Sequence, residues 1–295
     1  MAITLEQADE VIRAIGLTEP ASSVYPVAGG DTSQACVVQT KSGSLFVKIE
    51  PQVRAALLMA EADGLAALAT AGCVRVPRVL GQQTFEKERS RWLALEALDL
   101  KPRRRAIDRR LGQQLAELHR CQGAAFGWHR DNYLGSSVQA NPRHTDWTSF
   151  FRDHRLLAQI ESLRRRDRGR ILQPLISPLL KAWERLGAEH NPVPSLLHGD
   201  LWTGNAAALS DGAPVIFDPA VHFGDRECDL AMANLFGGFS GEFFSAYDQS
   251  WPRPSGWQQR RGFYELYHVL NHANIFGGGY IESAEERMKD LIKRA

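Results

Sequence analysis

Hydrophobic positions recur along the chain at two spacings, one typical of helices and the other of strands. Residues 4–17 carry apolar side chains at helical spacing, and Thr4 and Gln7 are spaced as the two members of a capping box. Short apolar runs that predict strands follow at residues 24–27, 45–49, 76–80 and 91–96. A helical stretch runs from about residue 53 to residue 69. We therefore expect a small antiparallel sheet accompanied by helices, ending at about Leu98.

From there onward the pattern is mainly helical. Apolar residues recur at helical spacing over residues 107–118, 150–160 and 266–273. Two short apolar runs, 195–197 and 214–217, differ from these and are typical of buried strands. The pattern predicts an α+β protein with an N-terminal lobe, residues 1–98, and a larger, mainly helical lobe, residues 99–295.

Each of the two buried runs is followed by a carboxylate. Asp200 comes after the first and Asp218 after the second, and four residues separate Asp200 from Asn205. This is the spacing of a kinase catalytic loop, in which the Asp accepts the proton of the attacking hydroxyl and the Asn holds metal. Amide and carboxylate oxygens suit Mg²⁺. We expect Asp200 to be the catalytic base, and Asn205 and Asp218 to be the metal ligands.

Other residues resemble metal ligands less closely. Glu227 and Asp229 stand at the predicted start of a helix and could extend the metal site, but we favour a structural role in which Asp229 hydrogen-bonds the catalytic loop. His268 and His272 are spaced as in some zinc sites. Since no third ligand accompanies these histidines, we do not expect zinc there.

The N-terminal lobe offers groups of the kind that bind phosphates. Lys48 ends a predicted strand among apolar neighbours, and Glu61 lies on the helix that follows. In kinases a strand lysine contacts the α- and β-phosphates and is held by a helix glutamate. The turn Gly29-Gly30-Asp31 could bring backbone amides close to phosphates, although a Gly-Gly pair by itself is more typical of an ordinary turn.

Composition restricts the class of protein. The chain has 295 residues, 44% of them hydrophobic, and its formal net charge of +1 argues against a protein whose main partner is a polyanion. Two basic clusters, residues 101–110 and 164–170, lack interleaved aromatic residues, so we interpret them as solvated helix faces and not as nucleic-acid sites. No apolar run approaches the length of a membrane span. We expect a cytoplasmic protein that binds neither nucleic acid nor membrane.

The four cysteines are dispersed, which suggests neither a disulfide framework nor a zinc site. Cys36 lies near the glycine turn and could make the protein redox-sensitive through an intermolecular disulfide. We favour an inert strand cysteine, because no activating basic neighbour is evident.

The motifs resemble those of one enzyme family. Residues 198–205, 218–220 and 224–231 are similar to segments of the fructosamine and ketosamine kinases, with aminoglycoside phosphotransferases and choline kinases as more distant relatives. A turn at residues 131–135 and a Trp before a Phe-Phe helix are also similar. The resemblance extends from about residue 5 to residue 285.

The resemblance implies a bilobal protein-kinase-like fold that binds ATP with Mg²⁺ between its lobes. The implied reaction is phosphorylation of the third-carbon hydroxyl of a ketosamine, the adduct that forms when glucose or ribose glycates a lysine. The phosphorylated adduct then falls apart, so the implied activity is protein repair. Gly29, Gly30, Asp31, Lys48 and Glu61 match the family's positions in the small lobe.

The resemblance also suggests where the substrates bind. By analogy with kinases, adenine would bond to the backbone of Glu96 and Leu98, in the segment between the lobes. Trp202 could pack on the sugar ring or belong to the core, and Asn271 and His272 could face the cleft.

Several alternatives stay open at this point. The chain could be another small-molecule kinase of the same fold, acting on an aminoglycoside, choline or a free sugar, or it could be a nucleotide-binding regulator without turnover. The preferred ketosamine and the choice between free and protein-bound adducts are not decided by the sequence. We expect a monomer or a weak homodimer.

Overall fold

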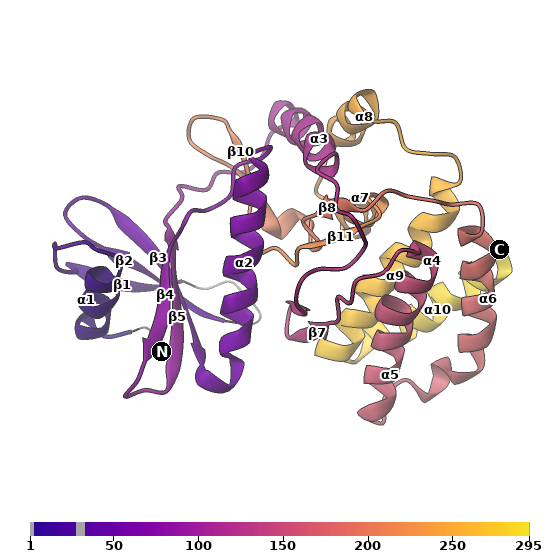
Figure 1. The fold of residues 1–295 in the computed structure, drawn as a ribbon, viewed down its shortest axis with the longest axis horizontal. Coiled ribbons are helices and arrows are strands. Elements are labelled where there is room, and N and C mark those ends of the chain that lie inside the picture. Colours follow the sequence, from indigo (N-terminus) through magenta and orange to yellow (C-terminus); the bar gives the residue numbers. More distant parts are fainter. Residues whose placement is uncertain (1–2, 28–32, 295) are drawn as a thin grey trace.

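In the computed structural model, which describes residues 3–27 and 33–294, the chain folds into two lobes (Figure 1). The smaller, N-terminal lobe contains a five-stranded antiparallel sheet with strand order β1-β2-β3-β5-β4. The larger lobe is mainly helical and includes three two-stranded sheets. The predicted α+β bilobal fold is therefore confirmed.

In its described residues, the small lobe contains the sheet, two α-helices and one short 3₁₀ turn. Its elements are α1 (Leu5–Ala14), β1 (Ser23–Val27), β2 (Gln34–Gln39), β3 (Ser44–Pro51), η1 (Gln52–Arg54), α2 (Ala55–Ala71), β4 (Val79–Phe85) and β5 (Ser90–Glu96). Helix α2 lies between the sheet and the larger lobe (Figure 1). A Cβ added at Gly64 of α2 would lie 3.1 Å from the side chain of Pro219, so this glycine lets the helix approach the segment after β10 closely.

The capping box predicted at the first helix is confirmed. The Thr4 hydroxyl accepts a hydrogen bond from the Gln7 amide at 3.2 Å, and the Gln7 side chain accepts from the Thr4 amide at 2.9 Å. These reciprocal bonds satisfy two of the amides that a helix N-terminus leaves unpaired. The buried face of α1 packs in one cluster with Val38, Val47 and Trp92 of the sheet.

The strand predicted at residues 76–80 was wrong in its first half. β4 begins at Val79 and continues to Phe85. The preceding residues connect the lobes: Arg75 forms a parallel bridge with Val215 of the large lobe, and Pro77 has no amide hydrogen for a strand ladder. Val76 is apolar because it is buried in the core, not because it belongs to the sheet.

The large lobe alternates helices with short strand pairs. Its elements are α3 (Arg105–His119), β6 (Asn132–Leu134), β7 (Ser137–Gln139), α4 (Trp147–Phe151), the π-helical segment η2 (Arg152–Leu157), α5 (Ala158–Arg165), η3 (Arg170–Leu175), α6 (Ile176–Gly187), β8 (Ser195–Leu197), η4 (Thr203–Asn205), β9 (Ala206–Ala208), β10 (Pro214–Ile216), β11 (His222–Gly224), α7 (Glu227–Leu235), α8 (Gly241–Ser250), α9 (Trp257–Phe276) and α10 (Gly279–Arg294). The two predicted buried strands exist, but they belong to different ribbons, since β8 pairs with β11 and β10 pairs with β9.

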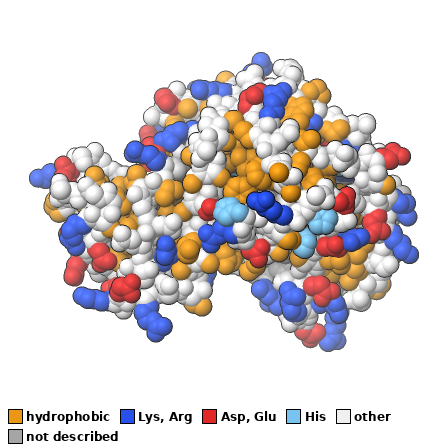
Figure 2. Space-filling model, viewed as in Figure 1, with side chains coloured by type: hydrophobic (Ala, Val, Ile, Leu, Met, Phe, Trp, Pro, Cys, Tyr) orange, Lys and Arg blue, Asp and Glu red, His pale blue; other side chains and the backbone are white. Residues whose placement is uncertain are grey.

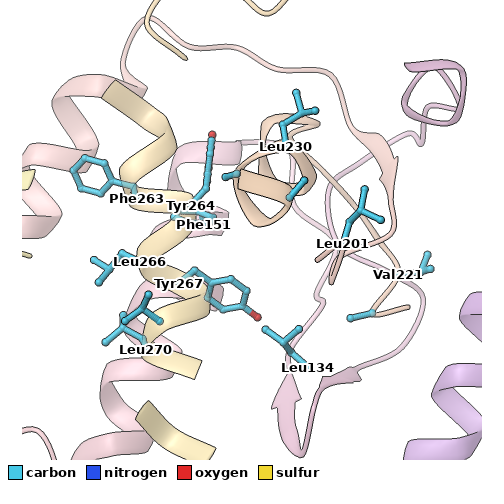
Figure 3. Close-up of a cluster of buried hydrophobic side chains, with 14 of the residues drawn as sticks. Leu134, Phe151, Leu201, Val221, Leu230, Phe263, Tyr264, Leu266, Tyr267 and Leu270 are labelled. Carbon is cyan, nitrogen blue, oxygen red and sulfur yellow. The ribbon is translucent and has the colours of Figure 1, made fainter. Parts of the chain in front are cut away.

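Helix α9 is central to the core of the large lobe. Its apolar side chains pack with those of α4 and α7 and of the segments around β8 and β11. In Figure 3, Tyr267 of α9 points toward Leu134 of β6, and both belong to the same buried cluster as Leu201 and Val221, from the segments that follow β8 and β10. The strands that lead to the predicted catalytic residues are thus packed into the same core as these helices.

The structure also shows how charges are distributed on one face and whether any helix could span a membrane. On the face shown in Figure 2, Lys and Arg side chains are interspersed with Asp and Glu. Within residues 3–27 and 33–294, none of the helices combines the length and the apolar run needed to cross a bilayer.

Candidate active site

The loop after β8 and the turn after β10 bring three predicted groups together. The side-chain nitrogen of Asn205 donates to a carboxylate oxygen of Asp200 at 3.1 Å and to the Asp200 carbonyl at 2.9 Å. It also lies 3.4 Å from the carbonyl oxygen of Asp218. Because the nitrogen is engaged in these bonds, the amide oxygen of Asn205 is the atom that could ligate a cation.

These groups carry an excess of negative charge. Burial, together with the charge of Asp218, raises the pKa of Asp200 to about 7. A divalent cation beside the two carboxylates would offset their repulsion. The available ligands, an amide oxygen and carboxylate oxygens, are those that Mg²⁺ prefers, so the donor set fits a magnesium ion.

The backbone of Asp218 is strained. Its φ of 56° lies in the left-handed region, which residues other than glycine rarely adopt. The residues on both sides hold it there, since the Phe217 amide donates to the Asn205 carbonyl at 3.0 Å and the Ala220 amide donates to the His198 carbonyl at 2.8 Å. Strain of this kind persists where the surrounding structure imposes it, commonly at functional sites.

Lys48 of β3 connects the small lobe to this group of carboxylates. Its ammonium nitrogen lies 2.8 Å from a carboxylate oxygen of Glu61 on α2 and 2.7 Å from one of Asp218. Burial by itself would lower the pKa of Lys48, but the two carboxylates outweigh burial and raise the pKa above its usual value. Lys48 is therefore a charged side chain at neutral pH, placed between the lobes.

The turn before Asp200 depends on a carboxylate from α7. Asp229 accepts hydrogen bonds from the amides of His198 and Gly199 at 2.7 and 2.8 Å, and its Oδ2 also lies 3.1 Å from His119 Nε2. Gly199 has a φ of 83°, and a Cβ there would lie 2.1 Å from the carbonyl oxygen of Ala220, so only glycine fits. The structural role predicted for Asp229 is confirmed.

Glu227 is separate from the predicted metal site. Its carboxylate forms a buried ion pair with Arg260, at 2.6 and 2.8 Å. His190, Asp225 and Glu227 lie close enough together to hold a metal ion. However, His190 and Asp225 already bond to each other at 2.6 Å, which points to a structural network.

Two adjoining cavities open at the predicted site. One, of about 350 Å³, is lined mainly by apolar side chains of the sheet, such as Val37 and Leu95, and by Lys48 and Asp218. The other, of about 170 Å³, shares Lys48 and Asp218 with the first and adds Asp200. A larger hollow of about 380 Å³ between α9 and α10 is lined by none of these groups. The two adjoining cavities thus combine an apolar slot with the predicted charged groups.

The segment between the lobes borders the apolar cavity. Glu96 and Leu98, the residues expected to meet adenine, both line it. The Glu96 amide donates to the carbonyl of Arg78 at 2.9 Å, and the Glu96 carboxylate binds Arg75 at 2.6 Å. The amide of Glu96 is therefore already paired within the small lobe.

The residues expected to contact the acceptor substrate separate into two groups. Trp202 lines the smaller cavity and is 38% exposed. Its ring meets Phe236 at 6.4 Å between centroids, and Phe236 meets His272 at 5.0 Å, so an aromatic surface extends from the cavity to α9. Asn271 points away from this surface.

The expectation that Asn271 faces the cleft was wrong. Its side chain is 2% exposed, and its nitrogen donates to the carbonyl of Leu134 at 3.3 Å. Adjacent positions on a helix point about 100° apart. His272 therefore faces the aromatic surface while Asn271 is buried against β6.

Two other expectations concern the small lobe. Gly29, Gly30 and Asp31 lie outside the residues that the structure describes. Cys36 is fully buried in β2, and burial raises the pKa of its thiol. An unreactive strand cysteine agrees with both observations.

Sequence reasoning missed Arg103, which belongs to a basic cluster interpreted as a solvated face. Its side chain is only 6% exposed and pairs with Asp108 at 2.8 Å. The guanidinium also donates to the carbonyls of Thr203 and Ala206, which flank Asn205, at 3.2 and 2.5 Å. That interpretation was therefore wrong for Arg103, and no local pattern could have corrected it because the loop carbonyls that it binds lie about a hundred positions away.

Comparison with known proteins places the site in context. A sequence model described as fructosamine kinase matches residues 6–294. A probable ketoamine kinase of Synechocystis is 40% identical over 269 residues, which are 90% of this chain and 89% of the relative. A chloroplastic protein-ribulosamine 3-kinase of Oryza sativa subsp. indica is 34% identical over 306 residues, covering 99% of this chain and 86% of the relative.

Solved structures show the same fold. A putative fructosamine-3-kinase from Thermobifida fusca superposes with a TM-score of 0.86 at 30% identity, covering 99% of this chain and 100% of the other. An aminoglycoside phosphotransferase superposes with a TM-score of 0.70 at 13% identity, covering 98% of this chain and 99% of the other. At that identity the second likeness concerns the fold alone.

Proposed function

Because the chain belongs to the fructosamine kinase family, we propose that it transfers the γ-phosphoryl group of ATP to the 3-hydroxyl of ketosamines, the adducts of sugars with lysine. The chain is a kinase, a phosphotransferase that acts on a hydroxyl group. The names of two relatives, a probable ketoamine kinase and a protein-ribulosamine 3-kinase, support the ketosamine as acceptor.

One observation carries the proposal for the site: Asp200, Asn205 and Asp218 converge beside Lys48 where two cavities adjoin. In the proposed reaction Asp200 accepts the proton of the sugar hydroxyl. The hydroxyl oxygen bonds to the γ-phosphorus as the bond from this phosphorus to ADP breaks. A carboxylate whose pKa lies near neutrality is suited to this proton transfer.

The remaining groups position the nucleotide. Asn205 and Asp218 would hold Mg²⁺, which when bound neutralises charge on the phosphates. Lys48, oriented by Glu61, would contact the phosphates, and the apolar cavity beside Glu96 would take the adenine. Gly29, Gly30 and Asp31 are proposed to cover the phosphates, on the strength of the resemblance alone.

The aromatic surface supports a substrate larger than a free sugar. Trp202 would pack on the sugar, and Phe236 and His272 would contact the chain attached to the amine. A phosphate at the third carbon stands on the carbon next to the ketone. Loss of a proton from the amine-bearing first carbon gives an enaminol, and the nitrogen lone pair of this enaminol can expel phosphate from the third carbon. This loss would destabilise the adduct, in keeping with a repair role.

A substrate panel with a base-deficient variant tests the proposal. ADP release would be measured with lysine adducts of ribose and glucose, with aminoglycosides, with choline and with free sugars, and ³¹P spectroscopy would locate the new phosphate. We expect turnover on the lysine adducts and at least ~10³-fold slower turnover for Asp200→Asn, with nucleotide binding retained.

The matched control is Asp211→Asn, a change at an exposed turn carboxylate that accepts a hydrogen bond from the Ala213 amide. It should leave turnover unchanged. Faster turnover on an aminoglycoside or choline than on any lysine adduct would make the chain a different small-molecule kinase. Equal activity of Asp200→Asn and the unmodified protein would remove Asp200 from its role, and no ADP release on any substrate would indicate a nucleotide-binding regulator.

A further inference from the structure

Cys73 and Cys121 lie side by side where the two lobes meet. Their sulfur atoms are 3.9 Å apart, and both side chains are only partly buried. Cys73 follows Gly72, which ends α2, and Cys121 comes just after α3. The two residues therefore bring a helix end from the small lobe against a helix end from the large lobe.

Each cysteine belongs to a segment that pairs with one of the two catalytic strands. The amide of Leu196 in β8 donates to the carbonyl of Cys121 at 2.8 Å. The amide of Ile216 in β10 donates to the carbonyl of Arg75, which stands two residues after Cys73, at 3.0 Å. The two sulfurs thus belong to the segments that pair with β8 and β10, the strands that precede Asp200 and Asp218.

We propose that Cys73 and Cys121 are a modification site, at which a reversible disulfide links the two lobes behind the active site. To form the bond, the sulfurs need to approach from 3.9 Å to about 2.05 Å. The other two cysteines, Cys36 and Cys228, lie outside this pair, and Cys36 is fully buried in β2.

The chemistry requires an oxidant of the small-disulfide class. The thiolate of one cysteine attacks a sulfur of the small disulfide and releases one small thiol. The thiolate of the other cysteine then attacks the mixed disulfide, forms the bond between the two protein sulfurs and releases the second small thiol. The protein loses two electrons and two protons, and the small disulfide is reduced to two thiols.

The surroundings of Cys73 slow its attack on such an oxidant at neutral pH. Burial and the neighbouring Cys121 raise the pKa of the Cys73 thiol to about 11. Only the thiolate attacks a disulfide, so the reaction should be slow at pH 7 and accelerate toward pH 9.

The bond would close a loop that contains the connection between the lobes. Positions 73 and 121 are 48 residues apart, and β4, β5 and the segment at Glu96 lie between them. A cross-link of this kind restricts the unfolded chain and tethers the Glu61-bearing helix to the large lobe. The oxidised protein should therefore melt several degrees higher than the reduced protein.

Oxidised glutathione at pH 8.5, applied to the full chain, tests the proposal. Free thiols are counted by maleimide labelling after denaturation, and the linkage is located by peptide mapping without reduction. We expect a loss of two thiols, a Cys73–Cys121 peptide, a monomeric band and a rise in the melting temperature, all reversed by dithiothreitol.

Variants make the outcome decisive. Cys73→Ser and Cys121→Ser should each abolish the linkage and the melting shift, whereas Cys36→Ala should retain both. A linkage between other cysteines, stable glutathione adducts on Cys73 or Cys121 without a bond between them, or no loss of thiols in the folded protein would each overturn the proposal. A bond that forms without raising the melting temperature would refute the tethering role.

Discussion

Replacing Asp229 with Asn should lower stability and disturb the turn that precedes Asp200. The carboxylate accepts from two buried amides, those of His198 and Gly199, and its Oδ2 also contacts the His119 ring. Asparagine can accept with one oxygen only, and its NH₂ group then faces a donor. An unsatisfied buried donor costs about 1–3 kcal/mol, and charge-assisted bonds become neutral ones, so the unfolding free energy should fall by about 3 kcal/mol.

The same change should slow turnover, because the two amides fix the turn that presents Asp200. A displacement of the base by about 1 Å can reduce the rate by about 100-fold. Urea unfolding followed by circular dichroism gives the stability, and ADP release at saturating ATP gives kcat under conditions where the variant is folded.

The control is Asp290→Asn, since Asp290 pairs with Arg294 at 2.7 Å in a half-exposed ion pair. Its stability should change by less than about 0.5 kcal/mol and its kcat not at all. An Asp229→Asn protein with the stability and kcat of the unmodified chain would refute the reasoning. A loss of stability with unchanged kcat would reduce Asp229 to a structural residue without influence on the base.

Further predictions concern the lysine, the buried arginine and pH. Lys48→Met leaves two carboxylates without their shared cation, so the unfolding free energy should fall by about 3 kcal/mol. ATP binding, measured by calorimetry, should also weaken. Unchanged ATP affinity would contradict the phosphate-binding role. Arg103→Lys keeps the charge but loses the forked donors to the loop around Asn205, so kcat should fall about tenfold. The control, Arg104→Lys at the exposed neighbouring position, should leave kcat unchanged. Equal kcat values for the two variants would contradict a role of Arg103 in holding this loop. Burial lowers the pKa values of His222 and His268 to about 3. Below about pH 6.5 the unfolded chain therefore binds protons that the folded chain does not, and stability should fall as the pH falls, by up to about 1.4 kcal/mol per pH unit for each histidine. Urea midpoints at pH 7, 6 and 5 would measure this slope, and a His222→Gln variant with the same slope as the unmodified protein would show that His222 does not contribute.

Local pattern predicted much of the architecture. The capping box at Thr4, the helix that carries Glu61 and the strand that carries Lys48 were all expected, because hydrophobic period and capping chemistry act over a few residues. The spacing of Asp200 and Asn205 was also readable in this way, since a short loop keeps its ends close.

Contacts between residues far apart in the chain could not be predicted from local pattern. Arg103 looks like one basic residue among several, yet it is buried because acceptors about a hundred residues away surround it. The apolar character of Val76 suggested a strand, but the residue belongs to the connection between the lobes. Asn271 and His272 are neighbours in sequence, and the packing of α9 against β6 decides which of them is buried.

The sequence by itself determined which side chains are available to this protein: the proposed base, the two proposed oxygen ligands and a lysine, on elements whose type follows from short-range periodicity. The tertiary structure decided which of those groups meet. Lys48 contacts Asp218 across 170 positions of chain, and Cys73 contacts Cys121 across a lobe boundary. Contacts of this kind depend on how whole elements pack, and packing is a property of burial and shape summed over many side chains, which no short stretch of sequence encodes.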